Sequence, residues 1–122
     1  MALMDYNKKS VDLLVTSFKR AKNREFLAVL AYKKQTKLFR GEREYSTDET
    51  LQLIGTITAL KVLHNPVNVI LYLNSNKLSR LLNERLRGYI TQGNIHQQSQ
   101  SQLLLEYHQL SMVHQIEIAR GD

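Results

Sequence analysis

The chain has 122 residues, a net charge of +6 at pH 7 and no cysteine. This length suits one domain, which we predict over residues 1–122, and the lack of cysteine excludes disulfides and thiolate metal sites. No apolar run approaches the ~20 residues that a membrane-spanning helix needs, and residues 1–10 lack the long apolar stretch of a secretory signal. We therefore expect an intracellular protein, either cytoplasmic or nuclear.

Three strands joined by short turns are predicted at the start of the chain, over residues 11–18, 25–32 and 37–44. Residues 19–24 form a basic turn between the first two strands, and residues 33–36 form a hairpin turn before the third. Strands with such short connections are most simply arranged as an antiparallel meander.

The stretch from Ser46 to Asn76 predicts a helix, a tight turn and a buried strand. Ser46 or Thr47 can accept hydrogen bonds from the first free amides of the helix. Apolar residues follow on more than one side of this helix, which indicates that it is covered by other elements. Asn65-Pro66 ends the helix, because a residue before proline is disfavoured in the helical conformation. Residues 69–73 form the strand.

The last third of the chain predicts two more helices and a final strand. The helices cover residues 77–86 and 102–112, with a polar segment over residues 88–102 between them, and the strand covers residues 113–119. Strands connected through helices are usually parallel with a right-handed crossover. The fold class is therefore α/β, with a five-stranded mixed sheet.

The middle of the chain resembles the ribonuclease H type I family. The resemblance lies in Thr47, Leu51-Gln52-Leu53, Ala59-Leu60, Asn65-Pro66 and Leu71–Ser75, and the order of elements on either side agrees with it. It implies the RNase H-like fold, with helices on both faces of the sheet. It also implies a further helix after the last strand, and we expect this terminal helix to be absent from the chain.

Active ribonucleases H, as the resemblance implies, cut RNA with two metal ions held by clustered carboxylates. The acidic positions of the family fall on Thr16, Gln52 and Asn74 in this sequence, and all three residues are neutral. Neutral side chains cannot offset the desolvation of two dications. Asp12 and Asp48 lie elsewhere on their elements and do not restore the cluster. We therefore expect no catalysis, no metal site and no cofactor, as in the non-catalytic connection or tether domains of reverse transcriptases.

Other catalytic patterns are absent from the sequence. No glycine-rich phosphate loop is present. The histidines at positions 64, 96, 108 and 114 lack a paired metal spacing supported by carboxylates. We predict that they lie at the surface or at the ends of helices.

The distribution of charge suggests a nucleic acid, whether RNA, DNA or a hybrid, as the partner. Residues 1–43 hold 11 Lys and Arg against 4 Asp and Glu, whereas residues 44–122 hold 6 against 7. Phosphate contacts need only cations and amides, so binding can persist without catalysis. Asp48 and Glu49 oppose this hypothesis, because their carboxylates would repel a phosphate backbone. The candidate binding residues are Lys19, Arg20, Lys22, Arg24, Lys33, Lys34, Lys37, Lys77, Arg80, Arg85 and Arg87.

A second hypothesis is a protein-interaction or dimerisation module that contacts no nucleic acid. An open edge of the sheet, the leucines at positions 78, 81 and 82, and Tyr89-Ile90 are candidate contact surfaces. Packing in the core explains the same residues equally simply, and a basic surface would also suit an acidic protein partner. Salt dependence separates the two hypotheses, because only phosphate contacts weaken steeply with salt.

Overall fold

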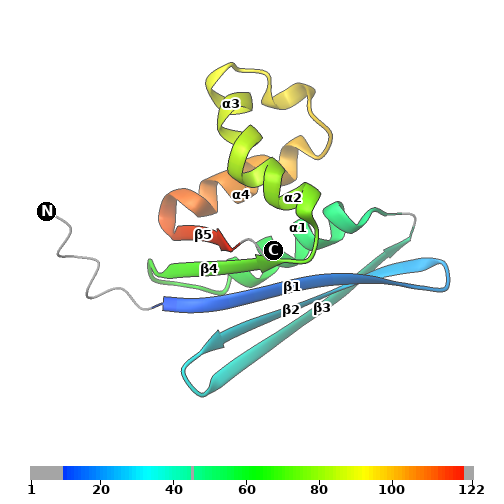
Figure 1. Cartoon of the computed structure of the whole chain (residues 1–122), viewed down its shortest axis with the longest axis vertical. Helices are drawn as coiled ribbons and strands as arrows, with labels where there is room; N and C mark the ends of the chain where they lie inside the picture. Colours follow the sequence, from blue (N-terminus) through cyan, green and yellow to red (C-terminus); the bar gives the residue numbers. More distant parts are fainter. Residues whose placement is uncertain (1–9, 45, 120–122) are drawn as a thin grey trace, which may run out of the picture.

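A computed structural model describes residues 10–44 and 46–119, and Figure 1 shows how their elements are arranged. The predicted order of strands and helices is confirmed. In chain order the elements are β1 (Ser10–Arg20), β2 (Asn23–Tyr32), β3 (Gln35–Glu44), α1 (Asp48–Leu60), β4 (Asn68–Leu73), α2 (Asn76–Arg80), a π-helical turn (Leu81–Arg85), α3 (Leu86–Thr91), a 3-10 turn (Ile95–Gln97), α4 (Ser101–Val113) and β5 (Gln115–Ala119).

The five strands form one mixed sheet in the order β3-β2-β1-β4-β5. The pairs β1–β2 and β2–β3 are antiparallel, whereas β4 lies parallel to both β1 and β5. The predicted meander and the predicted parallel crossover are therefore both confirmed. Because β1 and β4 run in the same direction, their carboxyl ends meet at one end of the sheet.

One face of the sheet carries the helices. Val11, Leu13 and Val15 point to this face from β1 and are buried, as expected for alternate residues of a strand. Helix α1 contacts β1, β2 and β3, and α4 packs against α1 and β5. This corrects the expected arrangement with helices on both faces, because every helix among the described residues lies on the same side (Figure 1).

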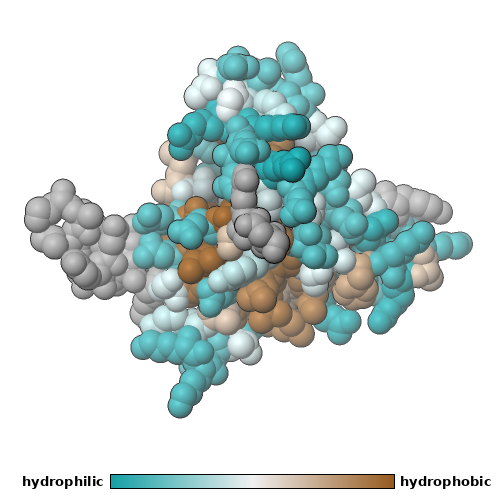
Figure 2. Space-filling view, in the orientation of Figure 1, coloured by the Kyte–Doolittle hydropathy of each residue, from teal (hydrophilic) through white to brown (hydrophobic). Residues whose placement is uncertain are grey.

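We call the opposite side of the sheet the open sheet face and define it by Leu14, Val29, Leu38 and Tyr72. Leu14 pairs with Val29 and with Tyr72, and Val29 pairs with Leu38. Leu14 is 48% exposed, Leu38 57% and Tyr72 40%. Figure 2 shows hydrophobic atoms gathered on the visible side of the molecule, over the strands. Exposed apolar patches of this kind are typical of contact surfaces.

Two glycines let Phe26 pack beneath α1. A Cβ atom on Gly41 of β3 would lie 2.3 Å from the Phe26 ring, and one on Gly55 of α1 would lie 2.7 Å from it. The Phe26 side chain is buried between these two close approaches. Gly55 stands inside a helix, where glycine costs about 1 kcal/mol relative to alanine, so close packing explains its presence there.

The helical segment after β4 differs from the prediction in its length. A π-helical turn interrupts the expected single helix, and α3 continues to Thr91. The expected polar segment therefore starts later, and it contains the 3-10 turn with a buried Ile95. Leu78 and Leu82 are buried in the core rather than available as contact surfaces. No helix among the described residues is long and apolar enough to cross a membrane.

His114 differs from the other histidines because it is buried, with 3% of its surface exposed. It follows α4 directly, so its predicted place at a helix end is confirmed. The backbone N–H of Val67 donates a hydrogen bond to its Nδ1 over 3.2 Å. Desolvation lowers the pKa of this imidazole below its usual value of 6.5. The neutral side chain thus ties the start of β4 to the start of β5.

We expect the free energy of unfolding to fall as the pH drops from 7.5 to 5.5. Below about pH 6.5 the unfolded chain takes up a proton at His114 and the folded chain resists it, so the unfolded state is favoured. His114→Asn keeps an acceptor near Val67 but does not titrate, and should lose less stability over this range. Urea denaturation at both pH values measures the difference. An equal loss in the variant and the wild type would contradict the role of His114, and His96→Asn is the exposed control.

Candidate functional site

A polar network lies where the carboxyl ends of β1 and β4 meet the start of α1. Its centre is Gln52 of α1, whose side chain is only 1% exposed. The Gln52 Nε2 donates to Ser17 Oγ over 2.9 Å, and the backbone N–H of Ser75 donates to Gln52 Oε1 over 2.9 Å. One neutral amide therefore joins β1, α1 and the turn that leads into α2.

Asp48 extends this network towards the surface. Its Oδ1 accepts hydrogen bonds from Ser17 Oγ over 2.7 Å and from Arg24 Nη1 over 2.8 Å. The Ser17 hydroxyl and then the Arg24 guanidinium hold the pKa of the Asp48 carboxyl below its usual 3.8. Asp48 is thus ionised at neutral pH and paired with a cation. We name Ser17, Arg24, Asp48, Gln52 and Ser75 together the Gln52 network.

Helix caps position two members of the Gln52 network. Thr47 caps α1 by accepting from the Thr50 N–H over 3.1 Å, which places Asp48 in the first turn, where a carboxylate is favoured by the helix dipole. Ser75 caps α2 by accepting from the Leu78 N–H over 3.1 Å. Because both helices begin at this end of the sheet, their first turns lie beside the ends of β1 and β4.

Of the three positions that the family resemblance singled out, only Gln52 belongs to this network. Thr16 lies one residue before Ser17, and strand alternation directs it to the open sheet face. There it lines a shallow hollow together with Asn74, Leu14 and Tyr72. The Asn74 backbone N–H donates to the Val15 carbonyl over 3.2 Å, which continues the pairing of β4 with β1. Ser17, not Thr16, is the β1 residue that contacts Gln52.

From the sequence, Ser17 and Ser75 were given no role in a site, and Asp48 was set aside. Two signals could have found Ser17 and Asp48. Ser17 has the same strand parity as the buried Val15, so it points towards α1. Asp48 precedes Gln52 by four residues, which places both on one side of the helix. Among the residues the structure describes, no group of three or more acidic or histidine side chains gathers as a metal site would require.

Several of the predicted cations lie at the same end of the sheet as the Gln52 network. Lys19 lies near the end of β1 and Lys22 in the turn that follows it, and Lys77 and Arg80 lie on α2. All four are exposed. The Lys77 Nζ lies 3.7 Å from Glu49 Oε1.

Two other predicted cations of this end are held in ion pairs. Arg20 Nε lies 3.3 Å from a carboxylate oxygen of Glu25, and Arg24 is paired with Asp48. The carboxylates of Asp48 and Glu49, which we expected to repel phosphate, therefore each have a cation close by.

The remaining predicted cations lie elsewhere, so the expected basic surface is divided. Lys33, Lys34 and Lys37 are at the hairpin between β2 and β3, which is ~30 Å away along a ten-residue strand. Arg85 and Arg87 follow in the π-helical turn and in α3, farther along the helical segment (Figure 1).

Comparisons with known proteins give matches in structure but not in sequence. No family model and no curated protein matches the chain. The fold is similar to that of LC9-RNase H1, a type 1 RNase H with the type 2 active-site motif, with a TM-score of 0.69 and 13% identity over 93% of this chain and 64% of that one. It is similar to prototype foamy virus protease-reverse transcriptase, with a TM-score of 0.70 and 15% identity over 94% of this chain and 18% of that one.

A third similar structure is LC11-RNase H1 in complex with an RNA/DNA hybrid, with a TM-score of 0.62 and 12% identity over 89% of this chain and 84% of that one. This chain spans less than two thirds of the length of the first two structures. At these identities the likeness shows the fold alone. Together with the strand order and the order of elements, it shows that the chain has the RNase H-like fold.

Proposed function

We propose that this chain is a non-catalytic RNase H-like domain that binds nucleic acid at the end of the sheet beside the Gln52 network. The observation that carries the proposal is the position of Lys19, Lys22, Lys77 and Arg80, which come from two separate elements and flank that network. Cations arranged along an edge can follow a phosphate backbone without reading sequence. The similarity to LC11-RNase H1, which was solved with an RNA/DNA hybrid, supports a hybrid as the first ligand to test.

The same network supports the non-catalytic part of the proposal. Both functional groups of the Gln52 amide are engaged by protein partners, and Asp48 is engaged by Ser17 and Arg24. Two-metal hydrolysis needs anionic oxygen ligands around each cation. A single carboxylate already paired with arginine would bind such ions weakly.

Fluorescence polarisation with a labelled RNA/DNA hybrid tests the binding. With four phosphate contacts we expect the affinity to fall about 100-fold between 50 and 200 mM salt, because each contact releases counterions. Lys77→Gln with Arg80→Gln should weaken binding about tenfold at 50 mM salt and reduce the salt slope. Lys33→Gln with Lys34→Gln is the matched control at the far end of the sheet and should have little effect. An equal loss in both pairs, or no binding at 50 mM salt, would overturn the proposal.

A second candidate function is a protein-interaction or dimerisation module, and the open sheet face favours it. Leu14 and Tyr72 are exposed neighbours on β1 and β4, and the exposed Leu38 of β3 is connected to them through Val29 of β2. Burying such a face would contribute ~25 cal/mol for each Å² removed from water. If this candidate holds, sedimentation at high micromolar concentration should show a dimer that Leu38→Asp disrupts. Met112→Asp on α4 is the control. A monomer at all concentrations would exclude self-association.

A further inference from the structure

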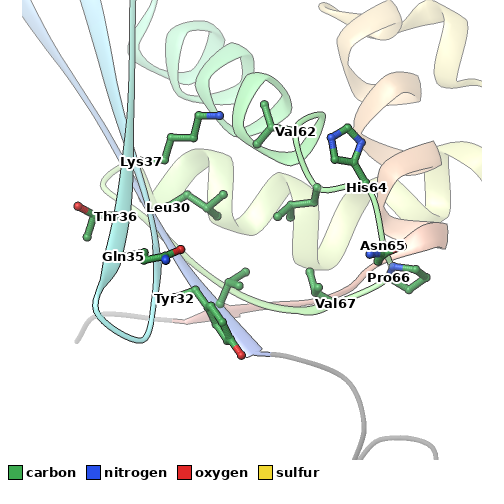
Figure 3. Close-up of a pocket in the computed structure, with 12 residues that line it drawn as sticks. Leu30, Tyr32, Gln35, Thr36, Lys37, Val62, His64, Asn65, Pro66 and Val67 are labelled. Carbon is green, nitrogen blue, oxygen red and sulfur yellow. The ribbon is translucent and has the colours of Figure 1, made fainter.

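A cavity lies beside the helices at the end of the sheet opposite the Gln52 network. It is a space of about 560 Å³ between the hairpin of β2 and β3 and the loop that joins α1 to β4 (Figure 3). Sites for small molecules usually enclose about 300–1,000 Å³. The cavity is thus large enough for a ligand, and none of the predicted catalytic positions lines it.

The cavity has an apolar floor. Val11 of β1, Leu30 of β2 and Val67 before β4 line it, and each is at most 9% exposed. Val62, in the turn that follows α1, adds a further aliphatic wall. A hydrocarbon group placed here would leave water and contact side chains from three separate segments of the chain, which favours binding by its apolar area.

The mouth of the cavity is polar and carries positive charge. Figure 3 shows the Lys37 ammonium on one wall and the His64 imidazole on the other. Lys37 makes no ion pair among the described residues, and its Nζ lies 5.8 Å from the centre of the Phe39 ring. Among the described residues no acidic side chain lines the cavity, and the adjoining turn adds Lys33 and Lys34. An anionic head group would meet a charge-assisted donor here, the stronger kind of hydrogen bond.

We propose that this cavity binds a small amphipathic carboxylate, with its hydrocarbon body against Val11, Leu30 and Val67 and its carboxylate beside Lys37. The mouth is open enough to leave part of the carboxylate in water, so the cost of desolvating the charge stays small. This proposal does not depend on nucleic-acid binding, which we place at the other end of the sheet.

Decanoate is the probe for this site. Its binding to the full chain is measured by two-dimensional amide NMR, at decanoate concentrations below its critical micelle concentration. We expect shift changes at Val11, Leu30 and Val67. Decanol, which has the same chain without the charge, should bind about tenfold more weakly. Lys37→Gln should weaken decanoate binding about tenfold, and Lys34→Gln, a neighbouring lysine outside the lining, should leave it unchanged.

A bulky side chain in the cavity gives a second variant. Val62→Trp should abolish the shifts while the rest of the amide spectrum stays native. If that variant does not fold, the comparison of decanoate with decanol still decides. The proposal is overturned if shifts appear at Leu14, Val29 and Tyr72 on the open sheet face instead. Three other results would also overturn the proposal. Decanoate and decanol could bind equally tightly, or the Lys37 and Lys34 variants could have equal effects. The third is that no shifts appear up to the solubility limit of decanoate.

Discussion

Replacing Gln52 with leucine is expected to lower the free energy of unfolding by about 2–3 kcal/mol, because it leaves the Ser75 N–H without its buried acceptor. The leucine side chain has a similar volume, so lost packing contributes little. Urea denaturation at pH 7.5 measures the loss. Gln109→Leu, on the exposed side of α4, should change stability by less than about 0.5 kcal/mol. A loss of similar size at both glutamines would contradict the structural role of Gln52.

Gln52→Glu separates hydrogen bonding from charge at the same position. A glutamate here would be buried and close to the ionised Asp48, so its pKa in the folded state should rise above the usual 4.3. The folded chain then binds the proton at position 52 more tightly than the unfolded chain, so the stability of the variant relative to the wild type should increase as the pH falls from 7.5 to 5. The wild type should lose stability over this range through His114. Parallel pH profiles of the two proteins would exclude a buried carboxylate at position 52.

Adding two carboxylates is expected to create a metal site at the Gln52 network. Ser17→Asp with Gln52→Glu would place two new carboxylates beside Asp48, giving a cluster of hard oxygen ligands. Without metal, mutual repulsion should destabilise this double variant. With Mn²⁺ at about 100 times its dissociation constant, binding should restore about 2.7 kcal/mol, measured as a rise in Tm that the wild type does not show.

The matched control for this gain of metal binding is Thr16→Asp with Gln52→Glu. Its carboxylate at position 16 would point to the open sheet face, away from α1. The same charges are added, but they do not converge, so Mn²⁺ should raise the Tm little. Because the family resemblance pointed to Thr16 and the hydrogen bonds point to Ser17, a larger rise in the Thr16 variant would contradict the structure at this site.

Much of the fold could be predicted from the sequence because its signals are local. The apolar runs of β2 and β4 indicate buried strands. Asn65-Pro66 predicted where the helix stops only approximately, because the steric rule sets a limit that a helix does not pass, and α1 already ends at Leu60. The packing of Phe26 between Gly41 and Gly55 could not be predicted, since it joins three elements distant in the chain. The π-helical turn also left no pattern, because leucines at helical spacing fit a regular helix equally well.

The candidate site was predicted only in part, for a related reason. The resemblance located Gln52 correctly at the end of the sheet, but an error of one residue in a strand moves a side chain to the opposite face. Thr16 was therefore named in place of Ser17. The basic residues were grouped by their closeness in sequence, whereas β2 separates Lys22 from Lys33 by its whole length. Charge counted along a chain does not give its distribution over a sheet.

We propose that the chain binds a nucleic acid without cutting it. The most direct test incubates an RNA/DNA hybrid, labelled on the RNA strand, with the purified wild-type chain in 50 mM salt and 10 mM Mg²⁺, and analyses the products on native and denaturing gels. We expect a shifted complex on the native gel and an intact RNA strand on the denaturing gel. Cleavage of the RNA that depends on Mg²⁺, or the absence of any shifted complex, would show that the chain is not a non-catalytic nucleic-acid-binding domain.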